Sequence, residues 1–280
     1  MSRAFAFVRP SPLPGFAPAL AAAMVWLGLL VLIPLSALVW RASDLGLSGI
    51  LAIATQPRVA AALKLSFGLS LLAAALNVVL GGVVAWVLAR YEFPGRRLLD
   101  AAVDLPFALP TAVAGIALTA IYAPNGWIGG FFDRFGVKIA FTPLGVFIAL
   151  VFIGLPFMVR SVEPVLAEID PEIEEASATL GASRWRTIFW VVLPPLASAF
   201  ITGFALSLAR AVGEYGSVVF ISGNIPFVSE IAPLLIVVRL AAYDDAGATA
   251  VATIMLALSF AMLLVVNLAQ SWARRKLGDG

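Results

Sequence analysis

Residues 175–194 read EASATLGASRWRTIFWVVLP and place a polar, glycine-containing turn directly before a long apolar run. Another apolar run ends at residue 159, and a group of acids between Glu163 and Glu175 separates the two runs. The segment carries no pattern typical of a catalytic centre. A short helix of small residues that ends at a glycine is instead well shaped for docking into a groove of another protein.

The composition indicates the solvent in which the chain folds. The chain has 280 residues, of which 62% are hydrophobic and 12% charged, and its mean hydropathy is +1.03. These values are typical of an integral membrane protein. A charge at the centre of a bilayer costs about 2.5–3.5 kcal/mol on insertion scales, so long uncharged runs mark the spans. The sequence therefore predicts an all-α integral membrane protein.

Six apolar runs are long enough to cross the hydrocarbon once each, because a crossing helix needs about 20 residues. Prolines kink the third run and restrict its helix to 106–122, and the fifth helix is expected from about Pro195 to about Ile221. A shorter run at 231–241 predicts an interfacial or re-entrant helix, with a seventh span as the alternative. The six long runs are 10–40, with a first transmembrane helix at 19–40, then 65–89, 105–132, 139–159, 187–209 and 246–273.

Lysine and arginine residues orient these spans, since cytoplasmic loops of membrane proteins are enriched in them. With the N-terminus inside the cell, eleven basic residues are cytoplasmic, six are external and Arg210 lies within a span. Both termini are therefore expected in the cytoplasm, as an N-terminal segment 1–18 and a tail 273–280. The first apolar run is longer than a secretory signal core and a second span follows it, which favours a retained anchor. The cytoplasmic set is Arg3, Arg9, Arg90, Arg96, Arg97, Arg160, Arg184, Arg186, Arg274, Arg275 and Lys276, and the external set is Arg41, Arg58, Lys64, Arg134, Lys138 and Arg239.

Several kinds of chemistry are excluded by residues that the chain lacks. It has no cysteine and no histidine, and therefore no thiol nucleophile, no imidazole base and no Cys or His metal site. It also lacks the G-x-x-x-x-G-K-[ST] phosphate loop. We therefore expect a non-catalytic subunit that binds no cofactor or metal and needs a partner chain for any ATP-driven work. The basic residues are spread among loops at a net charge of +2, which gives no support to nucleic-acid binding.

The section at 163–194 predicts two short helices joined at a glycine. Asp170 before a proline is a typical helix start, and acids in the first turn suit the positive end of the helix dipole. Gly181 can adopt the left-handed conformation that ends a helix. A second, amphipathic helix is expected at 183–192, after which Leu-Pro-Pro at 193–195 redirects the chain into the fifth span. The alternative is an ordinary loop whose acids form a solvated face.

This section resembles the cytoplasmic signature of permease subunits of ABC importers. Glu-Ala-Ser at 175–177, three residues, Gly181, nine residues, Val191, one residue and Leu-Pro at 193–194 follow the pattern E-A-A, three, G, nine, I, one, L-P, with serine and valine as two departures. In that family the element is a coupling helix that seats in a cleft of an ATPase subunit. The residues for which the resemblance implies a role in ATPase coupling are Glu172, Glu174, Glu175, Ala176, Ser177, Leu180, Gly181, Arg184, Leu193 and Pro194.

The resemblance covers about residues 20–272 and extends to the oxyanion branch of the family. AWVLARYEFPGRR at 85–97 and LPFALPTAVAGIAL at 105–118 are similar to the second and third spans of such importers, and RAVGEYGS at 210–217 is similar to the oxyanion branch. The motifs that look most like the T type of sulfate permease are NGW at 125–127, GNI at 223–225, VRLAAYD at 238–244 and LAQSW at 268–272.

The resemblance also implies a fold, partners and a substrate. The fold is that of a type I ABC importer permease, with a core permease domain at 63–272 that contains the coupling loop 163–194. The implied partners are ATPase subunits that hold ATP and Mg²⁺, a second permease subunit (a related W-type chain or a second copy), and a periplasmic or lipid-anchored sulfate-binding protein. The implied location is the bacterial inner membrane, among its lipids. The implied substrate is sulfate or thiosulfate, and the alternatives are molybdate, tungstate or another solute of the family, with a secondary transporter less favoured.

Arg210 and Glu214 stand four residues apart in a largely apolar run, which predicts that they share one face of a helix. One interpretation is an ion pair that neutralises itself and braces the helices. The other is an anion pathway, in which Arg210 offers a forked donor to a tetrahedral oxyanion and Glu214 sets its orientation, with Tyr215 and Ser217 beside them. The carboxylate weighs against the second interpretation, because it repels an anion.

Overall fold

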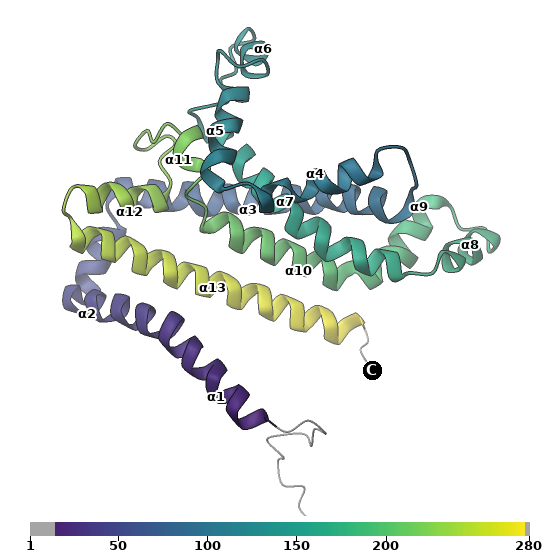
Figure 1. Ribbon diagram of the computed structural model, residues 1–280, viewed down its shortest axis with the longest axis horizontal. Coiled ribbons are helices and arrows are strands. Elements are labelled where there is room, and N and C mark those ends of the chain that lie inside the picture. The colour runs from purple at the N-terminus through teal and green to yellow at the C-terminus, as the bar shows by residue number, and fades with distance from the viewer. Residues whose placement is uncertain (1–14, 278–280) are drawn as a thin grey trace, which may run out of the picture.

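The computed structural model describes residues 15–277, which form helices joined by short connections (Figure 1). No strand occurs in this part of the chain, and five of its helices are long and apolar enough to cross a membrane. Helices α4 and α5 form a bent pair that supplies a sixth crossing if the two halves belong to one span. The all-α membrane architecture predicted from the sequence is confirmed. Residues 1–14 and 278–280, which belong to the expected terminal segments, lie outside the described residues.

Groups of short helices separate the long helices along the chain. The elements in chain order are α1 Phe16–Leu27, the π turn η1 Gly28–Leu32, α2 Ile33–Ala54, α3 Pro57–Arg90, α4 Arg96–Ala108, α5 Thr111–Tyr122, α6 Gly129–Asp133, α7 Pro143–Glu168, α8 Pro171–Thr179, α9 Arg184–Thr187, the π turn η2 Ile188–Val192, α10 Leu193–Val212, α11 Val218–Ile221, α12 Ala232–Ala241 and α13 Asp245–Leu277.

Helices α3, α7 and α10 form the centre of the bundle and bury polar side chains between them. Asn77 of α3 donates from Nδ2 to the Val151 carbonyl of α7 at 3.2 Å and to Ser207 Oγ of α10 at 3.1 Å. Gly154 of α7 leaves room for this contact, because a Cβ atom there would collide with both polar side chains. Close approach at small residues and interhelical hydrogen bonds hold membrane helices together where burial from water contributes little.

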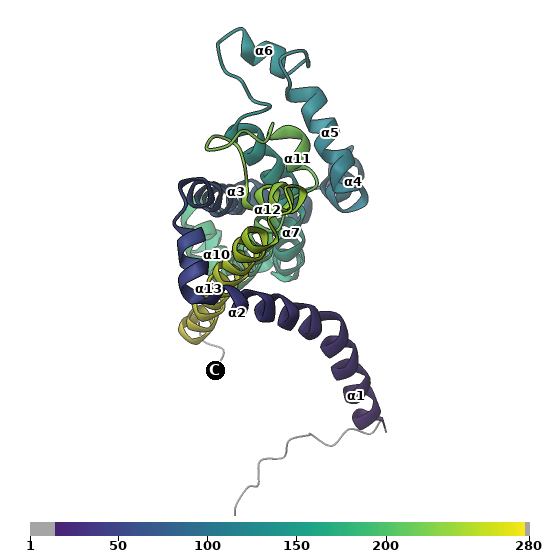
Figure 2. The same ribbon diagram turned by 90° about the vertical axis from the view of Figure 1, so that its left-hand side faces the viewer.

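The first helical stretch departs from this bundle (Figure 2). It runs from Phe16 to Ala54 through the π turn η1, and it bends at Gly46, whose φ of 65° is left-handed. It is therefore longer than the helix expected at 19–40. Its most apolar window is not buried within the described chain, and large side chains such as Trp26 are exposed. An apolar surface of this extent suits lipid or a second membrane subunit.

The third apolar run differs from the single helix expected at 106–122. Helices α4 and α5 meet at 116°, with Leu109 and Pro110 between them. Proline disfavours helical geometry at the preceding residue, and Leu109 is accordingly extended at φ −85° and ψ 133°. Pro106, by contrast, lies inside α4. The predicted break is confirmed at Pro110, and the predicted helix boundaries are wrong.

The fifth span begins earlier and ends sooner than expected. One helical segment runs from Arg184 to Val212 through the π turn η2, so the chain is not redirected at 193–195. A π turn changes the local hydrogen-bond pattern, and the prolines at 194 and 195 lie at the start of α10, where missing N–H donors are tolerated. The helix stops before Gly213 instead of continuing to Ile221.

Helix α12 settles the nature of the short apolar run near residue 231. Its ten residues extend about 15 Å, roughly half of the bilayer hydrocarbon, so it cannot cross alone. It packs against α3 and α13 and buries Leu234 and Leu235. A short helix in this place is confirmed, and the alternative of a seventh span at 231–241 is wrong.

Candidate functional site

Residues 163–168 of the coupling loop (163–194) belong to the end of α7, and α8 is its first short helix, which starts in the way the sequence predicts. The Asp170 carboxylate accepts a hydrogen bond from the Glu172 N–H at 3.0 Å. Pro171 occupies the first helical position, where no N–H is needed. Glu172 and Glu174 lie in the first turn, near the positive end of the helix dipole. Local chemistry therefore accounts for the start of this helix.

Gly181 ends α8 in the left-handed conformation expected from the sequence. Its φ is +85°, and the N–H of Ala182 donates to the Ser177 carbonyl at 3.1 Å. Nothing lies within 4 Å of the place a Cβ atom would take, so the backbone conformation by itself favours glycine. Ser183 then caps the next helix by accepting from the Arg186 N–H at 3.4 Å.

Side chains of α8 and its C-cap differ in how far they are exposed. Glu174 and Ser177 turn toward the rest of the chain, and Ser177 Oγ lies 3.0 Å from Thr187 Oγ1 of α9. Serine replaces the alanine of the family pattern here, and its hydroxyl joins the two short helices. Ile173, four residues before Ser177, is 49% exposed, and Leu180, three residues after it, is 88% exposed. Both apolar side chains are therefore open to contact from outside the described chain.

Arg90, the last residue of α3, holds α8 against the bundle. Its Nη1 donates to the Ile169 carbonyl at 3.0 Å, and its Nη2 lies 2.7 Å from Glu174 Oε1. The second contact is an ion pair without hydrogen-bond alignment. Both side chains are partly shielded, so water screens this pair less than an exposed one. Sequence spacing gave no sign of the pair, because its members are far apart in the chain.

The other residues expected in ATPase coupling differ in burial. Leu193 and Pro194 are partly buried in the first turn of α10. Trp185 and Phe189, which were not in the expected set, stack with ring centroids 6.0 Å apart and are both exposed. The exposed members of the expected set are Glu172, Glu175, Ala176, Leu180, Gly181 and Arg184.

Arg210 and Glu214 form an ion pair at the end of α10. Arg210 lies in the last turn and Glu214 follows the helix end, with 2.5 Å between Nη1 and Oε2. The other carboxylate oxygen accepts hydrogen bonds from the Ser217 N–H at 2.7 Å and from its hydroxyl at 2.9 Å. Because the helix stops before Gly213, the pair joins a helix to the turn after it, and the expectation of one helix face is wrong.

The guanidinium retains donors beyond this pair. The bond to Glu214 uses Nη1, which leaves Nε and Nη2 outside the pair, and the Arg210 side chain is 31% exposed. Tyr215 beside it is 37% exposed, whereas Ser217 is buried. Glu214, only 2% exposed, is satisfied by its partners and orients the arginine. The arrangement is therefore compatible with bracing and with an anion contact.

The turn at 214–217 packs against the first residues of α5. Gly216 lies against Thr111, and Gly115 lies against the backbone of Ser217, so that a Cβ atom at either glycine would collide with its neighbour. Glycine thus permits the close approach of these segments. As a result the bend between α4 and α5 lies beside the Arg210–Glu214 pair.

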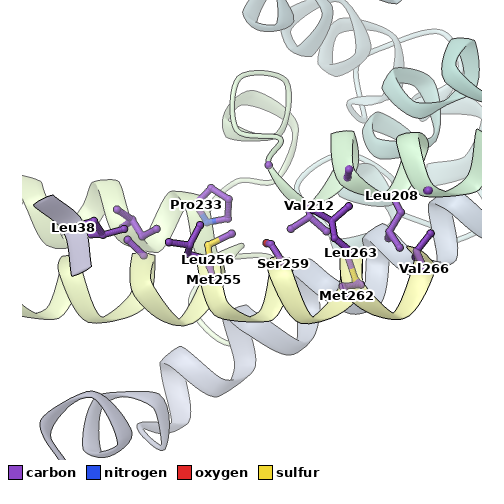
Figure 3. A pocket seen from close by; sticks show the side chains of 15 residues that line it. Leu38, Leu208, Val212, Pro233, Met255, Leu256, Ser259, Met262, Leu263 and Val266 are labelled. Carbon is purple, nitrogen blue, oxygen red and sulfur yellow. The ribbon is translucent and has the colours of Figure 1, made fainter. Parts of the chain in front are cut away.

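A separate apolar cavity of about 420 Å³ lies between α2, α10, α12 and α13 (Figure 3). Its lining consists of residues such as Leu208, Met255 and Leu263, and Ser259 contributes the one hydroxyl group. An anion would lose its hydration there without gaining donors, so the cavity does not suit an oxyanion. In the described part of the chain, no group of three acidic side chains is placed to hold a metal ion.

Residues 77–278 match the protein family described as the inner membrane component of binding-protein-dependent transport systems. This match covers more than half of the chain. The chain belongs to this family. Two relatives align with nearly the whole permease, and both are named sulfate transport system permease protein CysT. That of Synechococcus elongatus is 53% identical over 91% of this chain and 91% of its own length, and that of Escherichia coli is 45% identical over 95% and 96%.

Solved structures resemble the permease in fold. A bacterial ABC transporter involved in the import of the acidic polysaccharide alginate gives a TM-score of 0.75 at 14% identity, covering 91% of the permease and 94% of that chain. The bacterial alginate ABC transporter in complex with an alginate pentasaccharide-bound periplasmic protein gives 0.74 at 15% identity, covering 94% and 95%. Identities this low compare only the fold, and they confirm the type I importer permease fold predicted from the sequence.

Proposed function

We propose that this permease is the membrane-spanning subunit of an ATP-driven importer of sulfate. The observation that carries the proposal is its identity of 53% and 45%, over most of both chains, to permeases named for sulfate transport. Thiosulfate is a second candidate substrate and molybdate is the alternative, since each of them is, like sulfate, a tetrahedral dianion. The proposed location is the bacterial inner membrane, in agreement with the description of the family.

We infer that ATPase subunits dock on the coupling loop. Support comes from two exposed apolar residues, Ile173 on the nine-residue α8 and Leu180 directly after it, and from the left-handed Gly181 that follows. A short helix that presents small and apolar residues fits a groove on a partner. ATP and Mg²⁺ then belong to the ATPase, and this chain binds neither.

Transport would proceed by alternating access. Closure of two ATPase subunits around ATP moves α8, and the bundle switches between inward-open and outward-open states. A second permease subunit, either a W-type relative or a second copy, supplies the other half of the pathway. A sulfate-binding protein on the opposite side delivers the anion and provides most of the selectivity. Each ligand must bind one state more tightly than the other for this coupling to operate.

Arg210 is the proposed anion contact within the pathway. Its Nε and Nη2 donors lie outside the pair with Glu214, and a guanidinium fork matches two oxygens of a tetrahedral oxyanion. The hydrogen bonds from Ser217 help to neutralise the repulsion that a bare carboxylate would exert on an anion. Tyr215 is partly exposed beside the arginine and can offer its hydroxyl group.

Reconstitution tests the proposed function. The permease is purified with candidate ATPase, second permease and binding protein, and uptake of labelled sulfate into vesicles is measured with thiosulfate and molybdate as competitors. We expect uptake that requires ATP and the binding protein and that excess thiosulfate reduces more than molybdate does. Sulfate uptake without any ATPase would contradict an ABC importer, and uptake of molybdate in preference to sulfate would contradict the substrate.

A further inference from the structure

We propose that α3 is a rod that connects the coupling loop to the opposite end of the permease through an arginine ion pair at each of its ends. The proposal rests on the proposed function, since it assigns a path by which movement of α8 reaches the far side. Arg90 and Arg58 are positioning residues in this scheme, and neither needs to touch the substrate or the ATPase.

The pair at the far end is tighter than the pair at the loop end. Arg58, the second residue of α3, donates to Glu230 through two of its nitrogens, with Nε 2.8 Å from Oε2 and Nη2 2.6 Å from Oε1. Glu230 is 2% exposed and precedes α12. Ser66, also on α3, accepts a hydrogen bond from the Ala232 N–H at 2.7 Å. A bidentate contact fixes direction as well as distance, so the end of α3 and the start of α12 move together.

At the loop end Arg90 holds both Ile169, which directly follows α7, and the side chain of Glu174 on α8. The Ile169 carbonyl lies 3.0 Å from Nη1, and Glu174 Oε1 lies 2.7 Å from Nη2. Displacement of α8 therefore acts on the end of α3 as well as on α7 and α10, to which the chain joins it. The pair at each end is formed by residues distant in sequence, so these contacts join elements that the chain itself does not connect directly.

Helix α3 is built to transmit such a displacement. It is continuous over 34 residues, or about 50 Å, and its proline is confined to the first position. Figure 1 shows it running from the side of α12 to the end of the molecule that carries α8. Gly81 and Gly82 bring it into close contact with Met158 of α7 and Phe200 of α10. These contacts support the helix along its length when one of its ends is displaced.

The segment that the rod reaches is held in an unfavourable backbone conformation. Phe227 has a positive φ angle of 64°, in the left-handed region that a bulky side chain rarely adopts, and Asn224 has a φ of 49°, which asparagine tolerates better. Such conformations cost about 1–3 kcal/mol each and persist only where surrounding contacts impose them. Glu230 N–H donates to the Ile225 carbonyl at 3.1 Å, which ties the acid of the ion pair to this segment. A segment under strain can change conformation when its anchor at Arg58 moves.

The test uses the complete reconstituted complex and the ratio of anion imported to ATP hydrolysed. Arg90→Gln and Arg58→Gln should each lower this ratio about tenfold, a typical coupling between distant sites. The double variant should also be about tenfold lower, because one break already disconnects two contacts that act in series. Losses that multiply in the double variant would contradict the proposed role of α3. A ratio equal to wild type in the single variants would contradict it as well.

Arg160→Gln is the matched control. Arg160 lies on α7 and pairs with Asp100 and Asp104 of α4 at 2.7 Å each, so it clamps two helices without using α3. Its loss should multiply with that of Arg58→Gln, as expected for independent sites. If Arg160→Gln by itself lowers the ratio, a double variant no worse than Arg58→Gln would show that any weakened clamp has the same effect, and it would overturn a specific role for α3. If Arg160→Gln by itself keeps the wild-type ratio, that result supports the specific role of α3.

A charge-swapped pair keeps the proposal testable if Arg90→Gln fails to assemble. The combination of Arg90→Glu and Glu174→Arg preserves an ion pair between α3 and α8 but not the bond to the Ile169 carbonyl, so it should regain part of the wild-type ratio that Arg90→Glu loses. A ratio no higher than that of Arg90→Glu would overturn the role of the Arg90–Glu174 ion pair. The proposed function is judged separately by the wild-type complex: if that complex imports another anion in place of sulfate, the same ratios are measured with the anion it carries.

Discussion

A guanidinium and a carboxylate meet at residues 210 and 214, where an apolar helix ends. Glu214 is buried, and three contacts satisfy it: one from Arg210 and two from Ser217. Bracing alone would need no donors beyond these, yet Arg210 is partly exposed and uses only one of its nitrogens for the pair with Glu214. Substitution of the arginine can separate the two interpretations, provided that the buried carboxylate is not left as an unpaired charge.

Arg210→Ala combined with Glu214→Gln should abolish sulfate uptake while insertion and assembly persist. Loss of a charged hydrogen bond of about 1.5–3 kcal/mol corresponds to at least a tenfold effect on anion binding. The measurement is uptake in vesicles that contain equal amounts of assembled complex. Glu214→Gln alone is the control, since it keeps the guanidinium and removes the carboxylate charge. Uptake near that of the control would remove Arg210 from the pathway.

Among the elements, the coupling loop shows how far local chemistry reaches. Asp170, Pro171 and Gly181 set both ends of α8, because capping involves residues only a few positions apart. The continuation of α9 into α10 is different, since the two prolines after residue 193 predicted a change of direction that a π turn avoids. The loop therefore forms one arm that is rigidly joined to the fifth span.

Gly181→Val should weaken ATPase docking without preventing insertion. A β-branched residue with positive φ is strained by at least about 1–2 kcal/mol, so the turn between α8 and α9 would reorganise. Gly95→Val is a matched control, because Gly95 also has positive φ, at 94°, with nothing within 4 Å of its Cβ position. The amount of ATPase that co-purifies with each variant is the measurement. Equal amounts for both variants would contradict a specific role for the Gly181 turn.

At the scale of the whole molecule, the distribution of basic residues predicts which end faces the cytoplasm. The fold agrees with two opposite ends. Helix α8 lies at one end of the long helices, and α12 with the turn before α13 lies at the other (Figure 1). Tyr243, in that turn, is 94% exposed, and Ala178 of α8 is also exposed. Both positions are therefore accessible to a reagent in water.

Single cysteines test this orientation, because the natural chain contains none. In intact cells from which the outer membrane has been stripped, a membrane-impermeant maleimide should label Tyr243→Cys and leave Ala178→Cys unlabelled. Permeabilised cells should label both, which controls for accessibility. Labelling of Ala178→Cys in intact cells would contradict a cytoplasmic coupling loop and the positive-inside assignment on which it depends.

The sequence by itself determined the all-helical membrane architecture, the approximate positions of five spans and the ends of α8. Hydropathy and capping are properties of residues close together in the chain, and the bilayer imposes a length on every crossing helix. The family signature at 175–194 likewise needs no tertiary information. For these reasons the architecture, the type I fold and the left-handed Gly181 could all be predicted.

Tertiary structure decided the angle of 116° at Pro110, the helix end before Gly213 and the partners of Arg90 and Arg58. In a membrane every apolar helix face can be satisfied by lipid, so hydropathy does not reveal which faces meet. Ion pairs between distant residues depend on those faces and leave no periodic signal in the chain. The coupling loop could thus be located from the sequence. Its connection through α3 to the start of α12 became visible only in the folded bundle.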